Sequence, residues 1–365
     1  MFRLHRLITA LLAVILLLAA CGEQPAAEDT PEPTDAPAAA TEVSASDEPT
    51  EAAEPTEAAS DAASDLLPLT ITDAAGIEHT FETQPKLGCL WYGCTEIMAE
   101  LGIPIHASII SEEEAQSVFY APAGAPNHLV EDWQNPELWA ATEVDVIITR
   151  VPISPENDAL EAAAPIFYLH HPSYGESNET GYQAYIENLR LLSQLSGNPA
   201  AADAAIARFE TMKANLQALA TEDTADQTVA VLFSGEGFSG LSVDNPFCVV
   251  LAEVGLGQCP AAAEGESWID MNAEQFLALD PDWIVYQTFE DVSYTDRDDP
   301  VWDELTAMKE GRIFDAGNRY YCCSTRGLIH AFQDFVSTVM PDAGIPAPGR
   351  DLDFEPNESP LVQTR

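Results

Sequence analysis

The chain has 365 residues, of which 46% are apolar, and its 61 acidic and 14 basic residues give a formal net charge of −47 at pH 7. A chain of this size can bury one large core or two smaller ones, which excludes a peptide hormone or a wholly disordered tail. The acidity disfavours a nucleic-acid-binding protein and a basic membrane-surface protein.

Residues 1–21 predict an export signal. Arg3 and Arg6 precede an apolar stretch over residues 7–20, which ends at Cys21. The stretch is shorter than the ~20 residues of a membrane span, and its charged start and small residues before the cysteine are typical of a secretory signal. The ending resembles the lipobox of a bacterial lipoprotein, so we expect Cys21 to be lipidated and to anchor the protein by several acyl chains. An uncleaved anchor helix with a chance cysteine is the alternative.

Residues 22–65 predict a disordered, acidic Ala/Pro/Thr tether. They contain 13 acids, six prolines and no Lys, Arg or aromatic residue, and the hexamer EPTEAA occurs twice in tandem. Such a composition buries too little apolar surface to fold, and its like charges extend it. Residues 66–365 retain 48 acids and 12 basic residues, so the folded part is acidic as well.

The folded part begins with a predicted β-hairpin. Alternating apolar and polar residues at 69–73 and 77–81 flank Gly76. Residues 87–92 then predict a strand, and residues 95–101 predict a helix that ends at Gly102. A hairpin followed by strand and helix is the start of an α/β lobe.

The chain resembles itself when it is shifted by 137 positions. Residues 135–148 align with residues 272–285, and both segments predict a capped short helix, an Asp-containing turn and a buried strand. The identical pairs are Asn135/Asn272, Glu137/Glu274, Ala141/Ala278, Asp145/Asp282 and Ile147/Ile284. The match indicates either two lobes of similar architecture or the common pattern of helix–turn–strand units.

Two predicted helices lie between the copies. Residues 182–195 form the first, Gly197 and Pro199 interrupt the pattern, and residues 200–220 form the second. Apolar residues three or four positions apart give the second helix an apolar face about 30 Å long. We expect the lobe after it to contain strands at 228–233 and 312–315 and helices at 247–254 and 326–340.

These segments together resemble the extracytoplasmic solute-binding proteins of ABC importers, in the class that handles ferric siderophores, haem and cobalamin. The resemblance covers the chain nearly end to end. It rests on the order and spacing of five segments, which are residues 70–76 (TITDAAG), 95–102 (TEIMAELG), 199–220, 277–285 (LALDPDWIV) and 307–314 (AMKEGRIF).

The resemblance implies an α/β protein with two Rossmann-like lobes joined by one long backbone helix, and a ligand cleft between the lobes. The expected parts are a signal peptide (1–21), a tether (22–65), an N-terminal lobe (66–198), a linker helix (199–221), a C-terminal lobe (222–345) and an extended tail (346–365). The protein would be a monomer on the outer side of the cell membrane, held there by its lipid alone.

The family also implies that an acid on each lobe pairs with arginines of the permease. By motif position these acids are Glu137 and Glu253, although the usual Gly-Gly after the second one is here Gly255-Leu-Gly257. Such ion pairs mainly set orientation and encounter rate. A solvated helix acid is the alternative for each residue.

Ligand-binding residues are expected where strands end at the cleft. Aromatic faces suit a large flat or chelated ligand, and arginine suits carboxylate or catecholate oxygens. For any single residue, core or loop packing is an equally good interpretation. The candidates are Trp91, Tyr92, Tyr120, Arg150, Tyr168, His170, His171, Glu236, Phe238, Trp268, Gln287, Phe289, Arg319, Tyr320 and Arg326.

Two other motifs have weaker interpretations. Residues 235–240 fit the dinucleotide pattern GxGxxG, but no helix pattern follows them and an exported protein leaves the NAD pools. His170 and His171 are adjacent, so on a strand they would point to opposite faces, and direct metal binding would need a loop. We expect neither a cofactor nor a protein-bound metal, apart from iron or cobalt carried by the ligand.

Six cysteines remain besides Cys21, and outside the cytoplasm an even number favours disulfides. Local pairing favours Cys89 with Cys94 and Cys248 with Cys259. Cys322 and Cys323 are left over, as a disulfide, a thiol pair touching the ligand, or buried apolar sulfur.

The sequence thus favours a binding protein, not an enzyme. It would capture a metal chelate, a ferric siderophore first and cobalamin or haem next, and release it to an ABC permease. One alternative is a lipid-anchored thiol or redox protein that uses Cys89, Cys94, Cys322 and Cys323, although no CxxC motif is present. Another is a ligand sensor with the same fold.

Overall fold

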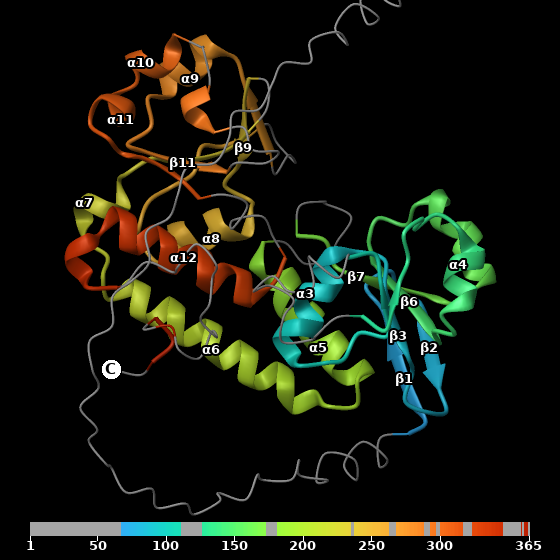
Figure 1. Ribbon diagram of the computed structural model, residues 1–365. Coiled ribbons are helices and arrows are strands. Elements are labelled where there is room, and N and C mark those ends of the chain that lie inside the picture. Colours follow the sequence, from blue (N-terminus) through green and yellow to red (C-terminus); the bar gives the residue numbers. More distant parts are fainter. Residues whose placement is uncertain are drawn as a thin grey trace, which may run out of the picture. The chain divides into compact units, whose positions relative to one another are not determined.

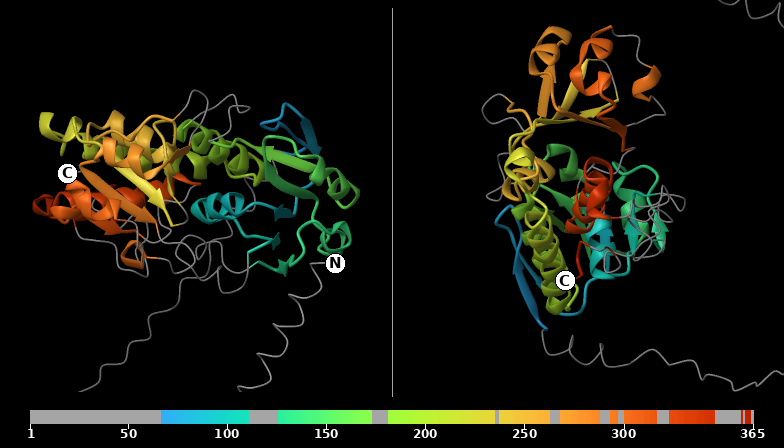
Figure 2. Two further views of the ribbon diagram at one scale, coloured as in Figure 1. Left: turned by 90° about the horizontal axis from the view of Figure 1, so that it is seen from above. Right: turned by 90° about the vertical axis from the view of Figure 1, so that its left-hand side faces the viewer.

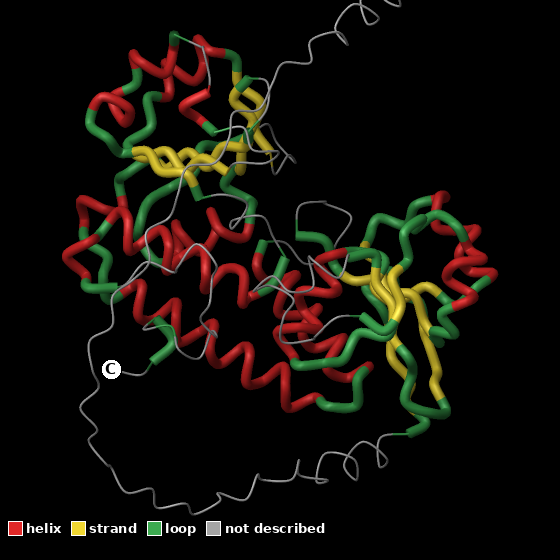
Figure 3. Tube along the Cα trace, viewed as in Figure 1, coloured by secondary structure: helices red, strands yellow, loops and turns green. Residues whose placement is uncertain are grey.

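The computed structural model describes residues 67–110, 126–172, 181–234, 237–262, 268–287, 293–296, 300–316, 323–345, 359 and 361–363. These residues form two α/β lobes, each built on a five-stranded sheet, which confirms the predicted fold class (Figure 1). Figure 3 shows the strands in two separate groups with helices between them.

The first lobe opens with the predicted hairpin, formed by β1 (Leu69–Thr72) and β2 (Glu78–Phe81). In the left view of Figure 2 the hairpin lies beside the green strands and apart from the orange ones. The sheet has the order β5-β4-β3-β6-β7, and all its strands are parallel, so their carboxyl ends share one edge. These strands are β3 (Leu87–Cys89), β4 (Ala107–Ser108), β5 (His128–Leu129), β6 (Val146–Arg150) and β7 (Ile166–Leu169).

The strand predicted at 87–92 is shorter in the structure, because the helix after it begins earlier. β3 ends at Cys89, and α3 (Tyr92–Leu101) starts three residues before the predicted position. Trp91 is the N-cap residue of α3 with an extended backbone, and Gly102 ends the helix at a positive φ of 66°. The other helices of this lobe are α4 (Pro136–Ala141), η3 (Pro155–Ala162) and α5 (Tyr182–Leu195).

The long helix is α6 (Pro199–Gln217), and it packs against α5 and α12 (Thr325–Val339) (Figure 1). Its buried face carries Phe209, Met212 and Leu216, as the apolar spacing predicts. The helix ends before the predicted residue 221, because Thr221 caps a separate short helix, α7 (Glu222–Ala225).

The second sheet has the order β10-β9-β8-β11-β12, in which β9 is antiparallel to both of its neighbours. A strand therefore follows Gly237, where a dinucleotide-binding fold would need a helix. The strands are β8 (Val229–Phe233), β9 (Phe238–Leu241), β10 (Trp268–Met271), β11 (Trp283–Gln287) and β12 (Ile313–Asp315). The helices besides α12 are α8 (Pro246–Glu253), α9 (Ala273–Leu279), η4 (Tyr294–Asp296), α10 (Val301–Glu304), α11 (Thr306–Lys309) and η5 (Pro341–Ala343).

The two copies of the sequence repeat have matching capped helices. The Asn135 side chain accepts a hydrogen bond from the N–H of Glu137 at the start of α4. The Asn272 side chain accepts one from the N–H of Gln275 at the start of α9. Both asparagines therefore satisfy a helix end.

The turns of the two copies match as well. Glu143 and Asp280 are 137 positions apart, and each adopts a positive φ, of 56° and 38°. Two residues later, Asp145 Oδ2 accepts from the N–H of Lys86 at 2.7 Å, and Asp282 Oδ2 accepts from the N–H of Thr228 at 2.8 Å. Each aspartate thus joins the strand that follows it to the strand beside it, β6 to β3 and β11 to β8. The identities have the same structural role in both lobes.

The largest apolar cluster includes residues of both sheets and of the helices between them, such as Leu87, Phe209, Val231 and Phe332. The chain end also contributes to it. Leu361 is buried in this cluster, and its carbonyl accepts from Asn215 Nδ2 at 2.7 Å. The end of the chain is therefore not wholly the extended tail that the sequence predicts.

Candidate functional site

A cavity of about 490 Å³ lies at the carboxyl edge of the first sheet. Its walls come from the loop at residues 90–92 after β3, from Ile109 after β4, from the end of β6 at residues 149–150, and from residues 152–157. Ligands of open α/β sheets bind outside the carboxyl ends of the strands. A second cavity, of about 340 Å³, lies at the opposite edge beside Lys86 and His106 and has the less favourable position.

Three of the predicted residues, Trp91, Tyr92 and Arg150, line the cavity, and the predicted His171 lies against Trp91. Trp91 is 4% exposed, and its ring lies 5.7 Å from the ring of His171 and 5.7 Å from Arg150 Cζ. Burial, and secondarily the charge of Arg150, lower the pKa of His171 to about 3. His171 is therefore neutral at physiological pH, and Arg150 supplies the positive charge of this cluster.

Gly93 allows the indole ring of Trp91 to take this place. A Cβ atom at position 93 would lie 2.4 Å from Trp91 Cζ2, a distance that real Cβ atoms do not adopt. Any side chain at this position would displace the ring or the start of α3. Gly93 was not among the predicted site residues, because nothing in its sequence context marks it.

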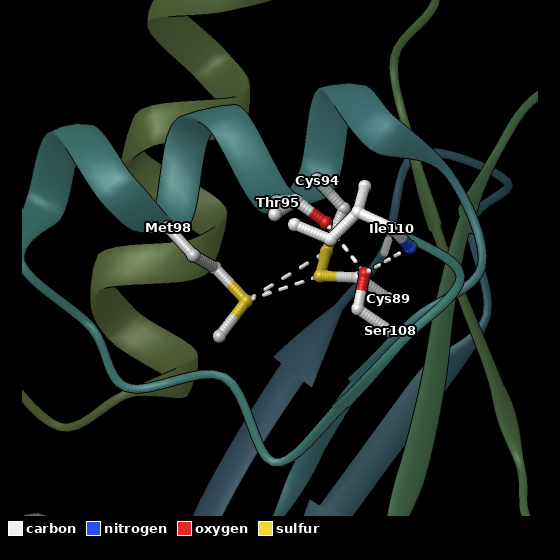
Figure 4. Close-up of a disulfide and its surroundings, with 6 residues drawn as sticks. All are labelled: Cys89, Cys94, Thr95, Met98, Ser108 and Ile110. Atoms are coloured by element: carbon white, nitrogen blue, oxygen red, sulfur yellow. Dashed lines mark hydrogen bonds between the residues drawn. A yellow bond between two sulfur atoms is a disulfide. The ribbon is translucent and has the colours of Figure 1, made fainter. Parts of the chain in front are cut away.

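A disulfide between Cys89 and Cys94 encloses the cavity loop (Figure 4). Cys248 and Cys259 form a second disulfide, so both locally favoured pairs are present. Cys323 is also disulfide-bonded, and its partner lies outside the described residues.

Two predicted residues of this lobe act through their neighbours. Tyr168 is 2% exposed, and its hydroxyl hydrogen-bonds to Asn157, which lines the cavity. The backbone of His170 pairs with the Asn188 side chain on α5, with its N–H 2.8 Å from Oδ1. Tyr168 thus lies buried behind this part of the cavity wall.

The residues predicted in the second lobe divide into buried and exposed groups. Phe238 is buried, and its ring stacks on that of Phe276 with the centroids 4.4 Å apart, so it packs in the core of the second lobe. Gln287 and Arg326 are also buried, at 0% and 2% exposure. Trp268 is 38% exposed, and its ring centroid lies 4.6 Å from that of Phe233, the last residue of β8. Five predicted residues lie outside the described residues, namely Tyr120, Glu236, Phe289, Arg319 and Tyr320.

The two predicted docking acids are both exposed, and Glu253 is in addition engaged by neighbouring side chains. Glu137 is exposed in the first turn of α4. The Glu253 carboxylate accepts from Lys213 Nζ at 2.8 Å and from the Tyr182 hydroxyl at 2.9 Å, so it joins α8 to α6 and α5. The repeat instead pairs Glu137 with Glu274, which is exposed in the first turn of α9. Glu137 and Glu274 are one of the five identical pairs of the repeat.

The lipobox Cys21 lies outside the described residues. Within the part of the chain that the structure describes, no helix is long and apolar enough to cross a bilayer. The same residues contain no group of three or more His, Cys, Asp or Glu arranged to hold a metal ion.

Comparison with known proteins gives a consistent picture. Residues 156–320 match the family described as periplasmic binding protein. The Fe(3+) dicitrate-binding periplasmic protein FecB of Escherichia coli K12 is 28% identical over 184 residues, which are 50% of this chain and 58% of that protein. The match therefore spans less than two thirds of this relative.

Solved structures of low sequence identity share the fold. FeuA of Bacillus subtilis complexed with ferri-bacillibactin has a TM-score of 0.54 at 18% identity, over 68% of this chain and 89% of that one. BauB, bound to two acinetobactin molecules and ferric iron, has a TM-score of 0.58 at 17% identity, over 75% of this chain and 96% of that one. FhuD of Vibrio cholerae, bound to Fe3+-Desferal, has a TM-score of 0.55 at 20% identity, over 67% of this chain and 94% of that one.

The resemblance to solute-binding proteins is confirmed by this family match and by the shared two-lobed fold. The relatives named here are binding proteins, and none is named as an enzyme.

Proposed function

We propose that this chain is a lipid-anchored solute-binding protein that captures a ferric chelate and delivers it to an ABC permease. The observation that carries the proposal is the cavity at the carboxyl edge of the first sheet, where Trp91, Tyr92 and Arg150 come together. The named structures with this fold hold ferric siderophores.

The chemistry of the wall supports an anionic, partly flat ligand. Trp91 and Tyr92 offer aromatic surface, and Arg150 offers a permanent positive charge. The amino end of α3 opens beside them, and its N-cap residue makes no side-chain capping bond, so its positive dipole end adds to that charge. A ferric siderophore with catecholate, hydroxamate or carboxylate oxygens fits best, and cobalamin and haem come next.

Delivery requires a membrane location and a docking surface. Lipidation at Cys21 with the tether at 22–65 supports the first, because the acidic tether keeps the lobes beside the membrane without folding on them. Glu137 and Glu274 support the second, because both are exposed and occupy equivalent places in the two lobes. We assign docking to this pair; Glu253 is exposed as well, at 41% of its side chain, but its carboxylate is engaged by Lys213 and Tyr182.

The redox alternative has less support. Cys89, Cys94 and Cys323 are all disulfide-bonded and are each 0% exposed. A redox enzyme needs an accessible thiolate. The sensor alternative differs from the importer only in lacking a permease partner.

Native mass spectrometry with an absorbance spectrum tests the ligand. The purified protein is offered ferric citrate, a ferric tris-catecholate, a ferric hydroxamate, haem and cobalamin in turn. A one-to-one coloured complex with a ferric chelate is expected. If only haem or cobalamin bound, that compound would replace the ferric chelate as the proposed cargo. If no compound of the panel bound, the proposal would be contradicted.

A further inference from the structure

We propose that the Cys89–Cys94 disulfide is a positioning element of the ligand cavity, which holds Trp91 and Tyr92 where a ferric chelate contacts them. The inference rests on the proposed function, because it concerns the wall of the proposed site. It assigns to a buried disulfide a role in binding, beyond its role in stability.

The position of the disulfide in the chain is the first observation. Cys89 is the last residue of β3, and Cys94 is the third residue of α3. The four residues between them are Leu90, Trp91, Tyr92 and Gly93, of which the first three line the cavity. The ring that the disulfide closes therefore contains these three residues of the cavity wall, held at either end by a cysteine.

The surroundings of the disulfide hold both of its ends (Figure 4). Both sulfur atoms are buried, and Met98 Sδ, one turn further along α3, lies 3.2 Å from Cys89 Sγ and 3.7 Å from Cys94 Sγ. Thr95 Oγ1 lies 3.0 Å from Ser108 Oγ at the end of β4, and Ser108 Oγ accepts from the N–H of Ile110. Strand β3, helix α3 and the loop after β4 thus meet at this one point.

The disulfide adds a covalent link where the amino end of α3 has no capping bond from its N-cap side chain, that of Trp91. The N–H of Leu90 bonds to the Ile148 carbonyl at 2.8 Å, and the N–H of Cys94 bonds to the Trp91 carbonyl at 3.0 Å. A loop fixed before binding loses less conformational entropy when the ligand arrives, which raises affinity.

The second disulfide is a matched control. Cys248 and Cys259 are also buried, and they close a longer loop, 11 residues apart against 5. In the loop-closure model their removal costs at least as much stability. Neither residue lines the cavity.

Hydrogen–deuterium exchange of the free, full-length protein tests the positioning without a ligand. In Cys89→Ala/Cys94→Ala we expect exchange over residues 90–95 to accelerate at least about tenfold, while Cys248→Ala/Cys259→Ala leaves it unchanged. Equal protection of these residues in wild type and in Cys89→Ala/Cys94→Ala would overturn the proposal. If this variant does not fold, Cys89→Val/Cys94→Ala keeps more of the buried apolar volume and allows the same comparison.

Affinity for the ferric tris-catecholate or ferric citrate gives the second readout. The Cys89→Ala/Cys94→Ala variant should bind at least about tenfold more weakly, and the Cys248→Ala/Cys259→Ala variant within about twofold of wild type. Equal losses in both variants would assign the effect to general stability and contradict the positioning role. If wild type binds none of the ferric chelates of the panel, the proposed function fails, whereas the exchange measurement still decides the role of the disulfide.

Discussion

Glu96 Oε1, on α3 of the first lobe, accepts a hydrogen bond from Ser324 Oγ at the start of α12, 2.8 Å away. The other oxygen of the same carboxyl group accepts from the N–H of Cys323 at 2.9 Å. One turn along α3, Glu100 Oε1 accepts from the Thr325 hydroxyl. The carboxyl groups of the buried Glu96 and the half-buried Glu100 therefore join α3 to the amino end of α12, where the helix dipole is positive.

These carboxyl groups make stability depend on pH. Burial raises the pKa of Glu96 from 4.5 to about 8, against the hydrogen bond from Ser324, and burial also raises the pKa of Glu100. Through these two groups the folded protein holds more protons than the unfolded chain above about pH 4.5, so they lower the free energy of unfolding as pH rises from about 4.5 to about 8. His171, whose pKa is lowered from 6.5 to about 3, acts in the opposite direction up to about pH 6.5, so the fall should be clearest between pH 7 and 9. Urea unfolding at pH 5, 7 and 9 measures this.

The Glu96→Gln variant separates this group from the other acids of the chain. Its free energy of unfolding should depend less on pH over that interval than that of wild type. Glu187→Gln, at an exposed ion pair with Arg190, is the control and should follow wild type. Parallel curves for wild type and Glu96→Gln would show that Glu96 does not change its charge there.

Gly93→Ala should weaken ligand binding, because the new Cβ would occupy the place of the Trp91 ring. We expect a loss of affinity of about tenfold or more, equivalent to about 1.4 kcal/mol. Gly102→Ala, at the other end of α3, introduces strain at a positive φ without touching the ring. It should cost about 1 kcal/mol of stability and leave affinity unchanged. Titration calorimetry with the ferric chelate that wild type binds compares the affinities of the two variants. Equal affinities would contradict the role of Gly93.

Arg150→Gln should reduce affinity for an anionic ferric chelate by about tenfold to a hundredfold, since a charge-assisted contact in a partly buried site contributes about 1.5–3 kcal/mol. The remaining affinity should also depend less on salt concentration than that of wild type. Arg190→Gln removes an arginine that is exposed and paired with Glu187, and it should bind as wild type does. An unchanged affinity of Arg150→Gln would remove the main argument for an anionic ligand.

The fold follows from local patterns that the sequence displays directly. The spacing of apolar residues on α6, the glycine that ends α3 and the two Asn caps of the repeat each depend on neighbours within a few positions. The repeat was visible because Asp145 and Asp282 each bond to the backbone of the adjacent strand. Because both lobes need a side chain that accepts this backbone hydrogen bond, both have Asp at this position.

The site was less predictable, because residue type and strand ends do not reveal where a side chain points. The predicted residues Trp91, Tyr92 and Arg150 line the cavity, and His171 lies against Trp91. Phe238 also follows a strand, yet it begins β9 and faces Phe276 in the core. Glu253 matched a motif position, but its carboxylate is engaged by Lys213, a contact between residues 40 positions apart that no local pattern indicates.

The docking assignment predicts that charge reversal separates uptake from binding. Glu137→Arg and Glu274→Arg should each reduce uptake of radiolabelled ferric chelate by cells, and the double variant should nearly abolish it. Affinity for the chelate should stay unchanged, because both acids are exposed on helices that do not line the cavity. Repulsion of the permease arginines should act mainly on the rate of encounter, so the defect should lessen at high ionic strength.

Glu253→Gln distinguishes this pair from the acid first indicated by motif position. It leaves Lys213, whose side chain is 13% exposed, without its carboxylate partner, and the expected effect is a loss of about 1 kcal/mol of stability with normal uptake. Thermal unfolding and uptake are measured on the same variants. The assignment would be contradicted if the Glu137→Arg/Glu274→Arg variant took up the chelate normally and Glu253→Gln did not, at unchanged stability and affinity. Glu253 would then be the docking residue, because a side chain with only a structural role cannot lower uptake while stability and affinity are intact.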